Sequence, residues 1–99
     1  MKNTAIDQET AEALAVNALG FIASSEALLP RFLQLTGIEA SAIREAAAEP
    51  GFLAGVLQFI AAHEPTLIAF CEATGAEPQS VGMALRALPL GDGEQQAGP

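Results

Sequence analysis

The segment ALGFIASSEALLPRFLQLTGIEASAI (residues 18–43) recurs in altered form as VLQFIAAHEPTLIAFCEATGAEPQSV (residues 56–81). Aligned without gaps at an offset of 38, the two segments are identical at ten of 26 positions, where this composition gives roughly one in ten by chance. The identities include Phe, Thr-Gly and Glu, which a high alanine content does not produce. A unit of this length is too small to hold its own core. The sequence therefore predicts two tandem three-helix repeats, near 7–43 and 45–81, that cover each other's apolar faces.

Helix start and stop signals divide the chain in the same way. Glu-Pro occurs three times, at 49–50, 64–65 and 77–78, and each pair is typical of a cap followed by a first helical residue. Gly37 and Gly75 follow expected helix ends. Pro30 either delays the start of the second helix or bends it. We expect helices at 7–23, 27–36, 40–48, 50–62, 65–74 and 78–87, an N-terminal extension at 1–6 and a disordered tail at 90–99.

The composition also indicates an all-α fold. The chain has 21 Ala and 12 Leu but three Val, no Tyr and no Trp, and β-strands favour the residue types that are scarce here. We expect Gly20, Gly55 and Gly82 to mark close helix crossings. The expected core consists of Leu14, Phe21, Leu29, Phe32, Phe52, Leu57, Phe59, Ile60, Leu67, Phe70 and Val81.

The charge balance argues against several classes of function. Twelve Asp and Glu against four Lys and Arg give a net charge of −8, which disfavours nucleic acids and anionic membranes. A helix-turn-helix at FLQLTGIEASAIREA would offer only Ser41 and Arg44 to DNA. Most carboxylates fall at expected helix starts, where they offset the macrodipole; an acidic surface for a basic partner is the alternative. The chain opens without a secretory signal pattern, has no ~20-residue apolar run and carries one cysteine, so we expect a cytoplasmic protein.

Few residues could support catalysis or bind a metal. Cys71 and His63 are the only candidates for nucleophile and base, and the apolar neighbours of Cys71 favour an inert thiol. Glu64 and Glu72 share a helical face but suit a solvated surface as well as a metal or acid–base site. Zinc sites generally need three or four ligands of the Cys, His or carboxylate type. We expect no enzyme activity, no cofactor and no metal.

Several motifs resemble a bacterial family of short all-helical proteins of unknown function, of the type seen in alphaproteobacteria. The matching stretches are ALGFIA (18–23), RFLQLTGIEASAIRE (31–45), EPGFLAGVLQFIAAHEPTLIAFCEATGAEP (49–78) and ALRALP (84–89). Where members of that family often have Asp-Pro at helix starts, this chain has Glu-Pro, a weaker cap. The resemblance implies the helical fold and carries no activity or catalytic residue.

Two functions remain for such a domain. The first is a non-enzymatic module that binds another protein or a second copy of itself, because a domain this small has many large apolar residues to bury. The expected interaction face is Leu33, Leu35, Ile68, Met83, Leu88 and Leu90. The alternative is a small apolar ligand bound between the repeats, in a pocket lined by Phe32, Phe59 and Phe70 with Thr36 or Thr74 as polar groups.

Overall fold

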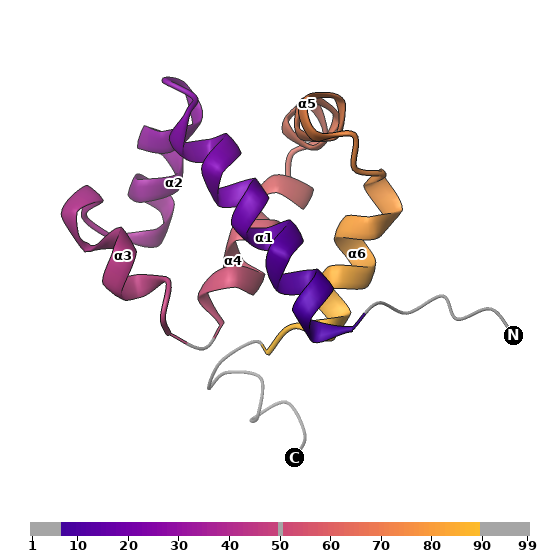
Figure 1. Cartoon of the computed structure of the whole chain (residues 1–99). Coiled ribbons are helices and arrows are strands. Elements are labelled where there is room, and N and C mark those ends of the chain that lie inside the picture. Colours follow the sequence, from indigo (N-terminus) through magenta and orange to yellow (C-terminus); the bar gives the residue numbers. More distant parts are fainter. Residues whose placement is uncertain (1–6, 50, 90–99) are drawn as a thin grey trace, which may run out of the picture.

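Alanine- and leucine-rich stretches form all the regular structure in the computed structural model, which describes residues 7–49 and 51–89 (Figure 1). These ranges contain no strand, so the all-α prediction is confirmed. The extension 1–6 and the tail 90–99 lie outside the described residues. The elements in order are α1 (Gln8–Ala23), α2 (Leu28–Thr36), the 3-10 turn η1 (Ala40–Ala42), α3 (Ile43–Ala46), α4 (Phe52–Ala61), α5 (Glu64–Thr74) and α6 (Pro78–Ala87).

Helix α1 organises the molecule and packs most extensively against α4 and α6. Its buried residues, Ala11, Ala15, Ala18 and Ile22, recur every three or four positions and therefore line one face of the helix. Because alanine side chains are short, they allow the helices to pack with little side-chain volume between them. The apolar cluster joins this stripe to the buried residues Phe32, Ala54, Val56, Leu57, Ile60, Phe70, Val81, Ala84 and Leu88.

The expected core is confirmed for its most buried members and incomplete in its small ones. Of the predicted residues, five are fully enclosed: Phe32, Leu57, Ile60, Phe70 and Val81. Six others pack against the cluster but are only partly buried: Leu14, Phe21, Leu29, Phe52, Phe59 and Leu67. The prediction omitted Ile22, Val56 and the alanines of the core, which are just as enclosed.

The two halves share the geometry of their first two helices. Helices α1 and α2 meet at 113° and helices α4 and α5 at 108°. The ends of α2 and α5 also agree: Gly37 and Gly75 adopt φ of +75° and +81°, a left-handed conformation that glycine adopts without strain. The Thr36 and Thr74 hydroxyls each donate to the carbonyl four residues earlier at 2.8 Å. These likenesses accord with the repeat pattern, while tandem duplication itself stays a prediction.

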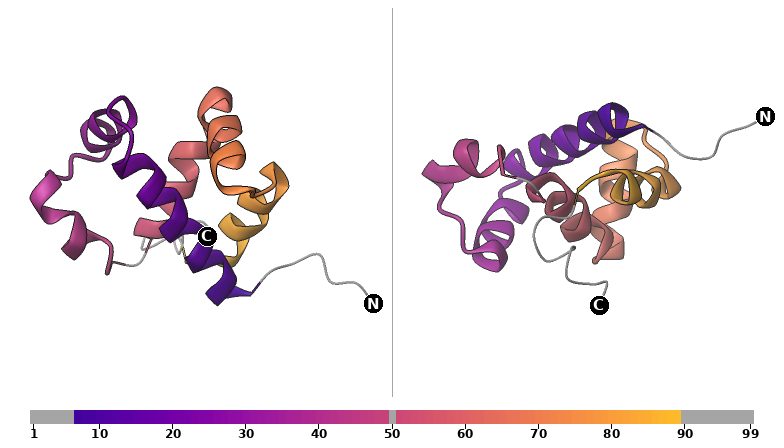
Figure 2. Two further views of the ribbon diagram at one scale, coloured as in Figure 1. Left: turned by 45° about the horizontal axis from the view of Figure 1, so that its top comes forward. Right: turned by 90° about the horizontal axis from the view of Figure 1, so that it is seen from below.

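The third helices of the two halves differ. Helix α6 packs against α1 and α4, whereas η1 and α3 contact each other more than any other element. The expected helix 40–48 is therefore replaced by a 3-10 turn and a single α-helical turn. A short helix without tertiary packing is marginal even when it is rich in alanine, which explains the correction. Figure 2 shows α2 and α3 on one side of α1 and α5 and α6 on the other.

Helix starts follow the expected signals in part. Asp7 caps α1 by accepting a 2.9 Å hydrogen bond from the Thr10 N–H, and Glu77 precedes a first-turn proline in α6 as predicted. Helix α5 begins one residue early, at Glu64. Helix α4 begins at Phe52 because Gly51, with φ of +89°, cannot belong to a right-handed helix.

Pro30 is the third residue of α2, so it lies in the first turn, where most N–H groups have no helical partner anyway. Ser25 closes this entry: its hydroxyl accepts from the Leu28 N–H at 3.1 Å and its carbonyl from the Leu29 N–H at 3.1 Å.

The expectation of close crossings at three glycines is wrong. A Cβ placed on Gly20, Gly55 or Gly82 would meet nothing within 4 Å. Close packing depends instead on the buried alanines of α1.

No single helix in the described ranges has the length and hydropathy to cross a bilayer. The pairs α1–α2 and α4–α5 have them only when the two helices of a pair, which are bent sharply against each other, are treated as one segment.

Candidate interaction surface

Large apolar side chains reach solvent on three helices. The exposed fraction is 54% for Val16 on α1, 69% for Leu35 on α2 and 47% for Ile68 on α5. Helices α2 and α5 lie on opposite sides of α1 (Figures 1 and 2). Leu35 and Ile68 are both exposed, but they do not belong to one continuous face, because their helices lie on opposite sides of α1. Val16 was missing from the expected interaction face.

The other members of the expected face are less accessible. Leu33 and Met83 are partly buried, and Leu90 lies outside the described residues. Leu88 is 6% exposed and belongs to the core, so its assignment to an interaction face is corrected. Helix α6 ends at Ala87 and Leu88 takes an extended conformation. This turn of the backbone places its side chain among the buried residues.

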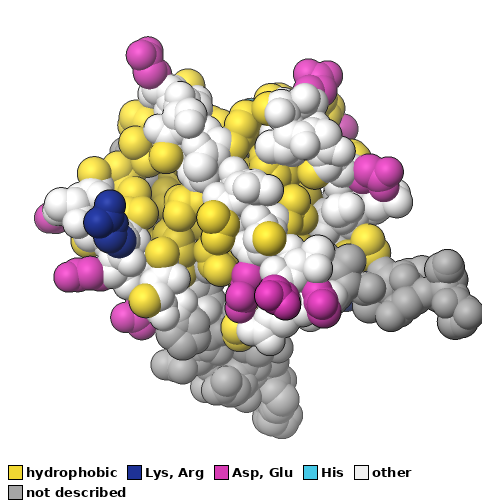
Figure 3. Space-filling view, viewed as in Figure 1, with side chains coloured by type: hydrophobic (Ala, Val, Ile, Leu, Met, Phe, Trp, Pro, Cys, Tyr) yellow, Lys and Arg dark blue, Asp and Glu magenta, His cyan; other side chains and the backbone are white. Residues whose placement is uncertain are grey.

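An open hollow separates α1 from η1 and α3. Its volume is about 600 Å³, and its lining consists of Leu19, Ala40, Ser41, Ile43, Arg44 and Ala47. In Figure 3, apolar side chains gather on both sides of α1, including the region between α1 and the α2–α3 part of the chain.

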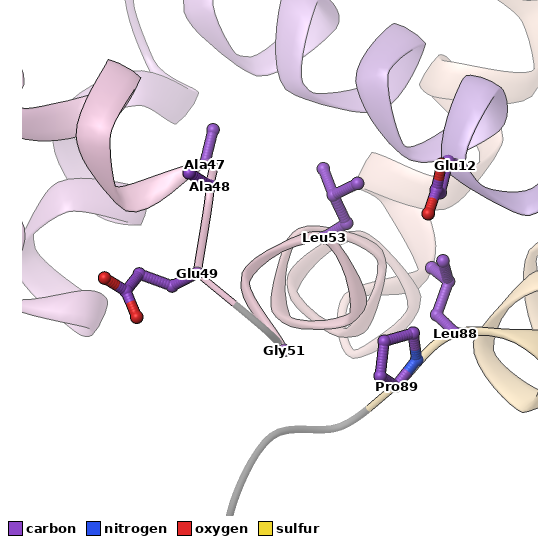
Figure 4. A pocket seen from close by; sticks show the side chains of 8 residues that line it. All are labelled: Glu12, Ala47, Ala48, Glu49, Gly51, Leu53, Leu88 and Pro89. Atoms are coloured by element: carbon purple, nitrogen blue, oxygen red, sulfur yellow. The ribbon is translucent and has the colours of Figure 1, made fainter.

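A second hollow of about 200 Å³ adjoins the first through Ala47. Figure 4 shows its lining, in which Leu53 of α4 and Leu88 lie below Glu12 of α1 while Ala47 and Ala48 lie across from them. The Glu49 carboxylate points away from the apolar floor. The two hollows share Ala47 as a lining residue, and together we call them the α1–α3 groove. Their lining combines apolar side chains with Glu12, Ser41, Arg44 and Glu49.

The outer side of the same segment is acidic. A shallow hollow of about 430 Å³ is bordered by Gly37, Ile38, Ala42 and Ala46 together with the exposed residues Glu39, Glu45 and Glu49. Arg44 is the basic residue of this segment. The η1–α3 segment therefore lines the first hollow with a mixed surface that includes Ser41 and Arg44, and its outer side carries carboxylates.

The phenylalanines that were expected to line a ligand pocket pack against each other instead. The Phe32 ring meets Phe59 edge to face, with 5.3 Å between ring centroids, and Phe52 at 6.1 Å. Phe70 meets Phe21 in the same manner at 5.6 Å. Because Phe32 and Phe70 are 1% and 0% exposed, these rings fill the space between the halves. The hydroxyls of Thr36 and Thr74 bond to their own helices and do not converge on a shared site.

The candidate nucleophile and base have separate surroundings. His63 is exposed at the start of α5, where its Nδ1 lies 2.8 Å from the Thr66 hydroxyl. Thr66 is the buried polar residue of the core region, so this contact closes the first turn of the helix. Cys71 is partly buried, and desolvation raises the pKa of its thiol. Within the described ranges no hydrogen bond joins His63 to Cys71.

In the part of the chain that the structure describes, carboxylates add no cluster that resembles a metal site. Glu64 and Glu72 are both exposed on α5. Across residues 7–49 and 51–89, no group of three or more His, Cys, Asp or Glu side chains is placed to hold an ion.

Comparison with known protein families gives a match that covers most of the chain. A family model described as "Protein of unknown function (DUF3572)" matches residues 8–91, which include every described helix. Searches of curated proteins and of solved structures return no match.

Proposed function

Because the chain belongs to the DUF3572 family, whose description names no activity, we propose a function from its surface: it is a helical module that binds another protein. The observation that carries the proposal is the exposure of Val16, Leu35 and Ile68, at 54%, 69% and 47%, whereas the other large apolar residues within 7–49 and 51–89 are at least partly buried. Burial of each of these side chains against a partner is favourable, because it removes apolar surface from water.

The proposal includes a non-enzymatic role, a cytoplasmic location and an alphaproteobacterial source. Its support is the sequence. The single cysteine suits a reducing compartment, and the scattered cations suit neither nucleic acids nor anionic membranes. The family motifs quoted in the sequence analysis support the alphaproteobacterial source. A second copy of the chain is the other partner that we consider, although a net charge of −8 on each copy opposes self-association.

The test compares three single variants, Val16→Gln, Leu35→Gln and Ile68→Gln, with the unchanged chain. Each tagged protein is incubated with lysate of the native host, cross-linked and analysed by mass spectrometry, while light scattering measures its mass in solution. We expect a partner that the unchanged chain retains and at least one variant loses. The same recovered proteins for all four chains, each a monomer, would contradict the proposal.

A small apolar ligand is the second candidate, and the volume of the hollow beside α3 is what favours it. About 600 Å³ lies within the usual range for small-molecule sites. The site would be this hollow and not the packed phenylalanines. Thermal melting in the presence of a panel of apolar metabolites tests it, and a shift that is abolished by Ala47→Gln, a change in the lining of the hollow, would support it.

A further inference from the structure

The segment of residues 38–49, which follows α2 and precedes α4, is weakly anchored to the rest of the molecule. Helices α1, α2, α4, α5 and α6 each contribute at least one buried residue, whereas none of residues 38–49 is buried. Elements η1 and α3 pack mainly against each other, and α3 lies at the edge of the molecule in Figures 1 and 2. Tertiary packing therefore contributes little to the stability of this segment.

The backbone hydrogen bonds of the segment are local. The Ala47 N–H donates to the Ile43 carbonyl at 2.8 Å, and the Glu49 N–H donates to the Ala46 carbonyl at 2.9 Å. Each bond joins residues three or four positions apart within the segment. These bonds can therefore break without disturbing a bond in the helices on either side.

Two aromatic rings hold the flanking helices together. Phe32 of α2 meets Phe52, the first residue of α4, edge to face with 6.1 Å between ring centroids, and Phe32 is 1% exposed. Gly37 and Gly51 lie between these rings and the segment, with φ of +75° and +89°. Glycine has no Cβ that would resist a change of backbone conformation at these two points. The ring contact keeps α2 beside α4, so the segment between them can move while both helices stay in place.

We propose that residues 38–49 form a flap that opens as one unit while α1, α2, α4, α5 and α6 stay folded. The flap borders the α1–α3 groove: Ile43 lines one hollow together with Leu19, and Ala48 lines the other together with Leu53. Leu19 and Leu53 are partly buried, so opening exposes more apolar surface on α1 and α4. Segments with few buried apolar contacts open at a lower free energy than the core does. The inference does not depend on the proposed function, because opening requires no partner.

Limited proteolysis with trypsin tests the flap, because the chain offers matched sites. Arg31, Arg44 and Arg86 are all exposed, and Arg44 is the one that lies in the flap. Each cleavage rate is divided by the rate for a short unfolded peptide with the same residues around the arginine. This corrected rate reports the population of the open form. We expect it to be at least ~tenfold higher at Arg44 than at Arg31 or Arg86.

Urea at about 1 M, below the unfolding transition, separates opening of the flap from unfolding of the whole chain. A small opening exposes little surface and therefore depends weakly on denaturant. We expect the corrected rate at Arg44 to stay nearly constant, while the rates at Arg31 and Arg86 rise.

The cleaved chain shows whether the other helices stay folded. Cutting after Arg44 leaves α1 and α2 on one fragment and α4, α5 and α6 on the other. Because α1 packs against α4 and α6, the two fragments should elute together from a size-exclusion column. They should also keep most of the far-UV circular dichroism signal of the uncut chain.

A variant in the flap and a control outside it complete the test. Ile43→Gln removes an apolar side chain from the lining of the groove and should raise the corrected rate at Arg44 about fivefold. Leu35→Gln makes a similar change on α2, at a side chain that is 69% exposed, and should leave the Arg44 rate unaltered. Circular dichroism confirms that both variants remain folded.

Several results would overturn the inference. These are equal corrected rates at the three arginines, an Arg44 rate that rises with urea as steeply as the other two, and fragments that separate and lose their helical signal. An unchanged Arg44 rate in Ile43→Gln would also overturn it, because the flap would then not close against the groove. The proposed function stands or fails separately, since its variants, at Val16, Leu35 and Ile68, lie outside the flap.

Discussion

Replacement of Phe70 by alanine should be among the most damaging single changes in this protein. Its side chain is 0% exposed, and its ring meets that of Phe21 edge to face with 5.6 Å between centroids. Removing a buried phenylalanine costs about 3–5 kcal/mol, which combines lost transfer free energy with the cavity left behind. Domains of this size have a free energy of unfolding of about 5–15 kcal/mol. We therefore expect Phe70→Ala to lose a large share of the stability.

Urea unfolding followed by far-UV circular dichroism measures this loss, since the chain has no Trp or Tyr for intrinsic fluorescence. The midpoint in a thermal melt should fall by at least ~12 °C, from about 4 °C per kcal/mol in a domain this small. Leu35→Ala is the control: Leu35 is 69% exposed, and the change should stay within about 0.5 kcal/mol. A loss below about 1 kcal/mol for Phe70→Ala, or one equal to the control, would refute the central place given to this ring.

Three further predictions concern two glycines, the cap of α1 and the cysteine. Gly75→Ala should destabilise by about 1 kcal/mol because φ at Gly75 is +81°, whereas Gly20→Ala, with open space around the new methyl group, should stabilise by about 0.5–1 kcal/mol; equal midpoints for the two variants would contradict this. Interactions with the Thr10 hydroxyl and N–H lower the pKa of Asp7 below 3.8, so its stabilisation is present above that pH and lost as the pH falls through the lowered pKa; thermal melts should show Asp7→Ala below the unchanged chain at pH 7 and the two converging toward pH 2. Because desolvation raises the pKa of the Cys71 thiol, a thiol reagent at pH 8 should modify the native chain more slowly than the urea-unfolded chain, and equal rates would argue against this burial.

The interaction surface was less predictable than the fold. Leu35 and Ile68 were expected at the surface and are exposed, but Leu88 is in the core and Val16 was overlooked. Helical periodicity indicates which residues share a face of one helix. It does not indicate which faces are left uncovered once six helices pack, because that depends on crossing angles and on which neighbours exist.

The aromatic residues show the same limit. Phe32, Phe59 and Phe70 were placed together as pocket walls, since their spacing puts them on apolar faces. In the structure Phe32 pairs with Phe59, and Phe70 pairs with Phe21 from α1. The partner of each ring depends on the relative positions of helices that are distant in sequence. A sequence pattern does not show whether the rings fill the space between the helices or surround a cavity there.

The helical class, the ends of most helices and the positions of the tight turns could be predicted from the sequence, because they depend on local properties: the propensity of alanine and leucine, the missing N–H of proline and the left-handed freedom of Gly37 and Gly75. The packing of α1 and its alanines against α4 and α6, and the open hollow beside η1 and α3, became visible only in the folded chain. Burial requires a neighbouring surface, and that surface comes from residues far away along the chain.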